Sequence, residues 1–141
     1  MSTTERRGKC LCGAVRVVGM PKGDGVAACH CTMCRNWGGG PMLVADCGED
    51  FHLEDEASVN VYESSGWAER GFCRHCGTHL FYRLKQGGRY FVPVGLFGDD
   101  EPWVLEHQIF IDEKPAFYAF ANATQNLTGA ELFAQFGQKP A

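Results

Sequence analysis

The stretch Cys29-His30-Cys31-Thr32-Met33-Cys34 places three cysteines within six residues. Cysteines this close together cannot form disulfides with one another without severe strain. Their sulfurs can instead converge on a single metal ion, and zinc is the ion that clustered thiolates favour in a soluble chain. Three protein ligands leave a tetrahedral ion one ligand short. The stretch therefore predicts a zinc site with an open coordination position.

The fourth ligand of this predicted site has several interpretations. It could be water, the thiol of a substrate, a histidine or Cys47, and Cys47 would close the site and make it structural. A labile or empty site is a further alternative, because three protein ligands hold a metal ion less firmly than four. Three thiolates on a divalent ion leave a net negative charge, which makes the ion a poor Lewis acid for a carbonyl group. The charge favours binding and ionising an incoming thiol instead.

Two further cysteine pairs, Cys10-x-Cys12-Gly13 and Cys73-x-x-Cys76-Gly77, resemble halves of a zinc site. In such a turn the sulfurs point the same way, backbone N–H groups can bond to them, and the glycine tolerates a positive φ. Together the pairs supply the four thiolates of a closed structural site, which would tie the first strand to the middle of the chain. The alternative is a redox dithiol at Cys73 and Cys76, which the absence of a βαβ pattern disfavours.

The composition is that of an ordinary globular chain of 141 residues with a net charge of −4. We expect one domain over residues 1–141, with a flexible tail at 1–7 and a C-terminal segment at 122–141 whose packing the pattern does not define. The sequence has no apolar run typical of a membrane span or a secretory signal, so we expect a cytoplasmic protein. In that compartment the cysteines are expected to bind metal rather than to form disulfides. Thiolates on two zinc ions would make the chain still more acidic, and this argues against a nucleic-acid partner.

Abundant glycine and short apolar runs predict a mainly β fold with one or two short helices near the C-terminus. The expected strands cover 14–18, 26–28, 42–45, 51–53, 58–62, 79–84, 89–94 and 104–111, with Gly87-Gly88 as a hairpin turn. Pro93 predicts a sheet edge or a bulge. We expect a loop at 36–41 and helical structure at 115–121. Thr128-Gly129-Ala130-Glu131 resembles a capping box that begins another helix.

Three segments of the chain together resemble the glutathione-dependent formaldehyde-activating (GFA) family. They are Gly8-Lys9-Cys10-Leu11-Cys12-Gly13-Ala14-Val15, Cys29-His30-Cys31-Thr32-Met33-Cys34-Arg35 and Gly71-Phe72-Cys73-Arg74-His75-Cys76-Gly77-Thr78. This family includes centromere protein V and shares its fold with a small zinc-binding Rab exchange chaperone. The resemblance implies a small, mainly antiparallel β fold with a structural zinc on Cys10, Cys12, Cys73 and Cys76. It implies a second, catalytic-type zinc on Cys29, Cys31 and Cys34.

The resemblance also implies the reaction of the family, in which glutathione and formaldehyde combine to S-(hydroxymethyl)glutathione. We therefore expect a zinc-dependent carbon–sulfur lyase that joins a small thiol such as glutathione to formaldehyde or another small aldehyde. The alternative is a non-catalytic interaction module in which both zinc ions are structural. Neither nucleic acid nor membrane is expected as a partner. The aromatic stripe of Phe117, Tyr118 and Phe120 is expected in the core, the alternative being that it forms a homodimer interface together with Phe133 and Phe136.

Four residues outside the cysteines are candidates for binding the substrates. Arg35 and Arg70 could each hold a carboxylate of glutathione, the alternative being a solvated surface charge. Trp37 and Gly38 could form a mobile lip over the open zinc position, the alternative being a packed loop. His30 is expected to orient the cysteine loop rather than to bind zinc, because alternate residues of an extended segment point apart.

Overall fold

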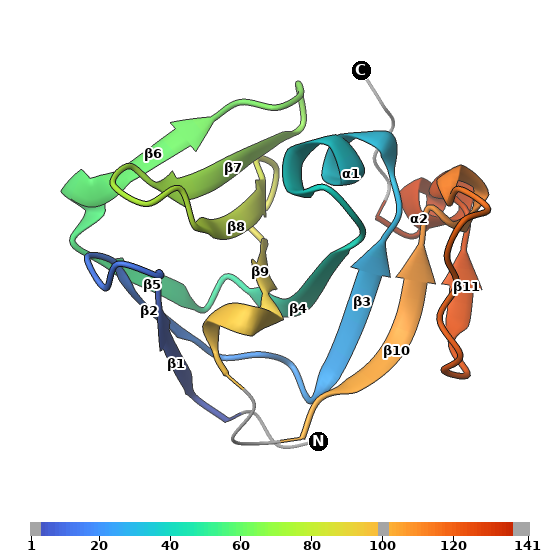
Figure 1. The fold of residues 1–141 in the computed structure, drawn as a ribbon, viewed down its shortest axis with the longest axis horizontal. Coiled ribbons are helices and arrows are strands. Elements are labelled where there is room, and N and C mark those ends of the chain that lie inside the picture. The colour runs from blue at the N-terminus through green and yellow to red at the C-terminus, as the bar shows by residue number, and fades with distance from the viewer. Residues whose placement is uncertain (1–3, 99–101, 137–141) are drawn as a thin grey trace.

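The computed structural model describes residues 4–98 and 102–136, and this part of the chain folds into two sheets (Figure 1). The smaller sheet has the strand order β1-β2-β5, with β1 (Arg6–Lys9), β2 (Arg16–Gly19) and β5 (Phe51–Glu54) all antiparallel. The larger sheet has the order β11-β10-β3-β4-β9-β8-β7-β6. Its strands are β3 (Gly25–Cys29), β4 (Met42–Gly48), β6 (Val59–Tyr62), β7 (Ala68–Cys73), β8 (His79–Leu84), β9 (Tyr90–Pro93), β10 (Val104–Ile109) and β11 (Gln125–Leu127).

The main apolar core lies between the two sheets. Val15 and Val17 are fully buried while Arg16 between them is exposed, so the period-two alternation around β2 selects the inner face. Phe51 of β5 meets Phe81 of β8 edge to face, with ring centroids 6.1 Å apart. The smaller sheet therefore covers one face of the larger sheet and leaves the other face available for a site.

The larger sheet is antiparallel from β3 to β6 and parallel beyond β3. The strand β10 pairs in parallel with β3, and β11 pairs in parallel with β10. Figure 1 shows β3 and β10 side by side and pointing the same way. The prediction of a mainly β, mainly antiparallel fold is confirmed. The two parallel pairings were not foreseen, because chain order does not reveal which distant strands pair.

Pro93 predicted a sheet edge or a bulge. The sheet edge was wrong, because β9 lies inside the sheet between β4 and β8. Pro93 is the last residue of β9 and stands opposite Val44, and the short 3-10 helix η2 (Val94–Leu96) follows at once. A proline at the end of a strand removes little from the ladder. The pairing of β4 with β9 does shift register, but between Asp46 and Gly48 rather than at the proline.

The helix α1 (Thr32–Gly38) covers residues that the sequence analysis left outside any helix, and its second half falls in the predicted loop 36–41. Cys31 is its N-cap, because the Cys31 sulfur accepts a hydrogen bond from the backbone N–H of Cys34 at 3.3 Å. Gly39 ends it with φ of 88° and donates to the carbonyl of Arg35. A cysteine N-cap is not among the preferred capping residues, so the start signal was missed.

The predicted capping box is confirmed at the helix α2 (Gly129–Phe136). The backbone N–H of Thr128 donates to Glu131 Oε1 at 2.8 Å, and the backbone N–H of Glu131 donates to Thr128 Oγ1 at 3.1 Å. Gly129 also packs closely against Phe110, since a Cβ at this glycine would lie 2.6 Å from the ring. This close contact seats α2 against the end of β10.

The predicted helix over 115–121 was wrong, because these residues form turns and irregular backbone. The expected aromatic stripe is split as a result. Phe117 is 84% exposed, while Tyr118 turns inward and places its hydroxyl 2.8 Å from His30 Nδ1. Phe133 of α2 meets Trp67 and Phe110 edge to face. The side chain of Phe136 lies outside the described part of the chain.

The two ends of the chain are described in part. The strand β1 begins at Arg6, inside the tail expected at 1–7, and residues 1–3 of that tail lie outside the described residues. In the segment 122–141, β11 and α2 are formed, whereas 137–141 are not described. Among the helices of the described ranges, none has the length and apolar character needed to cross a membrane.

Candidate metal centres and active site

The four cysteines of the two pairs converge, as the spacing predicted. Cys10 and Cys12 follow β1, while Cys73 ends β7 and Cys76 lies in the turn before β8, and the four sulfurs lie within 4.8 Å of one another. The Cys10 and Cys12 sulfurs are 3.6 Å apart, and those of Cys12 and Cys73 are 3.8 Å apart. A tetrahedral zinc ion with bonds of roughly 2.3 Å requires sulfur separations of roughly 3.8 Å. The cluster therefore fits a closed four-thiolate metal site.

Backbone donors and glycine turns shape this four-cysteine cluster. The N–H of Val15 donates to Cys10 Sγ at 3.3 Å, and the N–H of His75 donates to Cys73 Sγ at 3.4 Å. Gly13 and Gly77 follow the two pairs with φ of 82° and 80°, a region that favours glycine. Such N–H···S bonds orient the sulfurs and stabilise thiolates.

The other three cysteines form a second cluster of sulfurs within 4.8 Å of one another. Cys29 is the last residue of β3, Cys31 caps α1, and Cys34 lies in the first turn of α1. In the described part of the chain no further cysteine, histidine or carboxylate brings a ligand atom into this group. The three-cysteine cluster thus fits a metal ion and leaves room for a ligand from outside the chain.

Cys47 does not join the three-cysteine cluster. It is fully buried in the core between the sheets with Val17 and Phe51, and burial raises the pKa of its thiol to about 12. The interpretation in which Cys47 closes the second site is therefore contradicted by its position.

Arg70 places its guanidinium against the three-cysteine cluster. Its Nη1 and Nη2 donate to Cys34 Sγ at 3.7 and 3.6 Å, its Nε donates to Ser64 Oγ at 3.1 Å, and it is only 2% exposed. The guanidinium also stacks over the ring of Tyr82, with Cζ 4.9 Å from the centroid. A buried cation needs a compensating negative charge. The cysteine sulfurs supply it, so Arg70 is built to stabilise thiolates at this cluster.

The three thiols of the cluster shift one another's pKa values. Hydrogen bonds from the Cys29 and Cys34 thiols lower the pKa of Cys31 to about 2, with Arg70 contributing in the same direction. The same contact with Cys31 raises the pKa of Cys29. A metal ion binds cysteine as the thiolate, so binding of an ion at this cluster would release the protons of the remaining thiols.

His30 anchors the loop between Cys29 and Cys31, as the sequence analysis expected. It is fully buried, with Nε2 2.8 Å from Gln108 Oε1 and Nδ1 2.8 Å from the hydroxyl of Tyr118. The Gln108 amide nitrogen donates to Thr124 Oγ1 at 2.9 Å, which directs the amide oxygen at the imidazole. His30 therefore donates through Nε2, and burial lowers its pKa, which favours the neutral ring.

A cavity of about 580 Å³ opens directly beside the three-cysteine cluster. Cys29, Cys31, Cys34 and Arg70 line one end of it. The cavity lies on the face of the larger sheet opposite the core, and side chains of α1 and α2 border it as well. Its volume is typical of sites for small organic molecules.

Of the four substrate-binding candidates, only Arg70 lines this cavity. Arg35 donates to the backbone carbonyls of His30 at 2.9 Å and Glu113 at 3.2 Å, so it ties α1 to the chain after β10. Trp37 stacks on His79 with centroids 4.7 Å apart and borders a separate surface hollow. Gly38 lies beside the same histidine, because a Cβ atom added at this glycine would lie 3.9 Å from His79 Cε1. The structure thus does not bring Arg35, Trp37 or Gly38 to the cavity.

The strands, the four-cysteine cluster and the three-cysteine cluster together define a small β fold with two clusters that could hold metal ions. A model of the family described as glutathione-dependent formaldehyde-activating enzyme matches residues 5–113. The chain belongs to this family, and the resemblance of its three cysteine segments is confirmed.

Two relatives support this assignment. A protein of Schizosaccharomyces pombe described as an uncharacterized lyase is 35% identical over 129 residues, covering 91% of this chain and 94% of its own length. A crystal structure of a Rhodobacter sphaeroides protein matches with a TM-score of 0.58 and 24% identity, over 68% of this chain and 91% of that chain. The first supports a lyase-type enzyme, while the second shows a shared fold.

Sequence reasoning missed several contacts of the site because the partners are far apart in the chain. Glu113 Oε1 accepts from the N–H and hydroxyl of Thr32 at 2.8 and 2.9 Å, across 81 positions. Gln108 is 78 positions from His30, and Arg70 is 36 positions from Cys34. No local pattern marks such pairs. The motif before Cys73 includes Gly71 and Phe72, but it carried no signal for the guanidinium–sulfur contact of Arg70.

Proposed function

We propose that this chain is a zinc-dependent carbon–sulfur lyase that joins a small thiol, such as glutathione, to formaldehyde or another small aldehyde. The proposal rests on the three-cysteine cluster, whose sulfurs converge with no fourth ligand from the described residues and face a cavity of about 580 Å³. The family and the lyase relative agree with this class of reaction. In this proposal Cys10, Cys12, Cys73 and Cys76 hold a structural zinc ion, and Cys29, Cys31 and Cys34 hold a second, catalytic-type ion.

The second zinc ion, when bound, would supply a coordination position that binds the substrate thiol and ionises it. Arg70 contributes a positive charge at 3.6 Å from Cys34 Sγ, which offsets the negative charge that accumulates on the sulfurs. His30 and Arg35 hold the cysteine loop through the contacts given above, so the sulfurs keep their relative positions. These side chains bind and orient, and none of them needs to transfer a proton to perform that role.

The reaction itself is an addition without oxidation or reduction. A carbon–sulfur bond forms between the thiol sulfur and the aldehyde carbon, while the C=O double bond becomes a C–O single bond. The proton of the thiol is released on ionisation, and a proton is taken up by the new hydroxyl group. The cavity beside the cluster provides space for both partners.

The test is NMR exchange spectroscopy of formaldehyde and glutathione with the zinc-loaded protein, its Cys31→Ser variant and Cys47→Ala as the control. Serine is a favoured N-cap, so Cys31→Ser should preserve α1 while removing a thiolate ligand. We expect acceleration of exchange by the native protein and by Cys47→Ala, and loss of acceleration in Cys31→Ser. Absence of acceleration by the native protein with every thiol tried would refute the proposal.

A further inference from the structure

The cavity extends well beyond the three-cysteine cluster along one face of the larger sheet. Cys29 on β3 stands opposite Met42 on β4, and two residues away Ala27 stands opposite Val44. Ala27, Met42 and Val44 all line the cavity. Residues separated by two positions share a face of a strand, so this row continues the surface that carries the Cys29 sulfur.

The remaining walls away from the sulfurs are mainly apolar. Phe91 of β9 lines the sheet side, Leu132 and Phe133 of α2 line the opposite side, and Trp67 lies beside them. Phe133 is held edge to face against Trp67, with centroids 6.2 Å apart. Formaldehyde and a thiol group would occupy a small fraction of this space. The walls thus suit an apolar body attached to one of the reactants.

The charged residues of the cavity wall do not form a site for an anionic peptide. Its cations among the described residues are Arg70, whose guanidinium faces Cys34 Sγ and Ser64 Oγ, and Lys22. The carboxylates are Asp46, Glu106 and Glu113. Because Asp46 is paired with Arg89, the remaining charges of the wall balance, with Arg70 and Lys22 against Glu106 and Glu113. Glutathione carries two carboxylates and one ammonium group, so its net negative charge would meet no excess of positive charge here.

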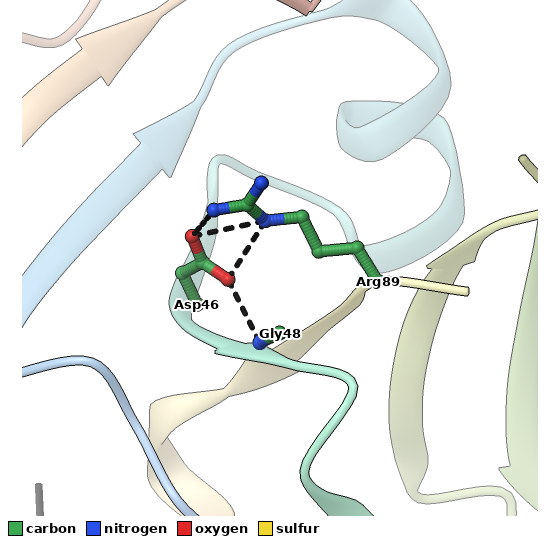
Figure 2. Close-up of polar contacts among 3 residues, drawn as sticks. All are labelled: Asp46, Gly48 and Arg89. Atoms are coloured by element: carbon green, nitrogen blue, oxygen red, sulfur yellow. Dashed lines mark hydrogen bonds and ion pairs between the residues drawn. The ribbon is translucent and has the colours of Figure 1, made fainter. Parts of the chain in front are cut away.

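The charge of Asp46 is matched by a guanidinium from outside the cavity wall. Figure 2 shows the Asp46 carboxylate in an ion pair with Arg89, whose Nη2 and Nε donate to Oδ2 at 2.6 Å and to Oδ1 at 3.1 Å. The backbone N–H of Gly48 donates to the same carboxylate at 2.9 Å. Arg89 does not itself line the cavity and is committed to this pair. It therefore adds no anchor for a substrate carboxylate.

We propose that the preferred thiol of this site carries an uncharged apolar body, aromatic or branched aliphatic, which lies along Ala27, Val44 and Leu132 while its sulfur meets the three-cysteine cluster. This inference rests on the proposed function and specifies its thiol substrate. The bond changes are those already given for the addition, so the apolar body contributes binding alone. Shape and charge of the cavity then select this thiol over glutathione.

The experiment is isothermal titration calorimetry of the metal-loaded protein with three probes: 2-phenylethanethiol, 2-mercaptoethanol and glutathione. The first two share a thiol on a two-carbon chain and differ in a phenyl ring against a hydroxyl group. Burial of the ring should make 2-phenylethanethiol bind roughly 10- to 100-fold more tightly than 2-mercaptoethanol. We expect it to bind more tightly than glutathione as well.

Two cavity-filling variants test where the ring lies. Ala27→Phe fills the cavity from the sheet, and Leu132→Trp fills it from α2, so one readout remains if the other variant fails to fold. Leu43→Phe is the matched control, because Leu43 is 39% exposed and lies outside the cavity wall. Either filling variant should reduce the preference for 2-phenylethanethiol about 10-fold, and the control should leave it unchanged.

The outcomes separate this inference from the proposed function. Tighter binding of glutathione, or a preference that both filling variants leave intact, would overturn the inference even if exchange of formaldehyde is accelerated. A ring-dependent preference that the filling variants abolish would support it, and calorimetry reports this whether or not any thiol reacts. Absence of reaction with 2-phenylethanethiol as well as glutathione would count against the enzyme and not against the apolar subsite.

Discussion

Replacement of Arg70 by methionine should weaken metal binding at the three-cysteine cluster while leaving the four-cysteine cluster filled. The guanidinium nitrogens lie 3.6 and 3.7 Å from Cys34 Sγ, and the side chain is 2% exposed. Two unit charges about 4 Å apart interact by about 4 kcal/mol at an effective dielectric constant of about 20. Methionine keeps the volume and apolar stem of the side chain but removes the charge.

The measured loss should be smaller than the Coulomb energy, because the variant also avoids the cost of burying a guanidinium. Loss of a group that supports a metal ligand typically lowers affinity 10- to 100-fold, which corresponds to about 1.4 to 2.8 kcal/mol. We expect a decrease in this range for Arg70→Met. Arg70→Lys should fall between the variant and the native protein, because it keeps the charge without the planar pair of donors.

The assay is competition for zinc with a chromophoric chelator, which resolves the tighter and weaker ions of each protein. Arg83→Met is the matched control, because Arg83 lies on the neighbouring strand, is partly exposed and pairs with Glu69 at 3.5 Å. Equal zinc affinity of the second site in native protein and Arg70→Met would refute this account of Arg70. So would an equal weakening by Arg83→Met.

Three further variants give separate readouts. Cys73→Ser should cost one bound metal ion and lower the melting temperature by roughly 10 °C or more, measured by metal analysis and calorimetry, because the ion links distant segments. Cys47→Ala should retain the native metal content. Because the pKa of Cys47 is raised from 9.0 to about 12 on folding, its contribution to stability is complete below pH 9 and is lost as the pH rises toward 12. From pH 8 to 10 the native protein should thus lose about 1.4 kcal/mol more unfolding free energy than Cys47→Ala, in denaturant titrations. Thr128→Ala should lower the unfolding free energy by about 1 kcal/mol through loss of the α2 cap, and an unchanged value would show that the cap is energetically silent.

The sequence predicted the features that depend on local spacing. The grouping of Cys10 and Cys12 with Cys73 and Cys76 followed from ligand counting, and the structure brings their sulfurs together. The capping box from Thr128 to Glu131 was likewise visible in four residues. The first inference needed only the number of ligands that a closed zinc site requires, and the second needed only the short-range geometry of a helix cap.

Features that depend on distant packing were not predictable in this way. Pro93 favoured an edge position for β9, yet β9 lies in the interior of the sheet. The sheet tolerates the proline because it is the last residue of the strand. The alternatives for Arg70 were a contact with a substrate carboxylate and a solvated surface charge, whereas its guanidinium is buried and contacts the Cys34 sulfur. The aromatic run near Tyr118 has helical spacing, but Tyr118 is drawn to His30 across 88 positions. In each case a tertiary contact decided what the local pattern left open.

The two cysteine clusters differ in when they can assemble during synthesis. The three-cysteine run is complete once residue 34 has left the ribosome, whereas the other cluster must wait for Cys76. An ion on that cluster would close a loop of 61 positions between Cys12 and Cys73, a constraint worth about 4 kcal/mol of unfolded-chain entropy on the disulfide scale. Under the proposed function, a nascent chain can therefore complete the ligand set of the second zinc ion first and that of the structural zinc ion last, so the link between the two sheets would form only late in synthesis.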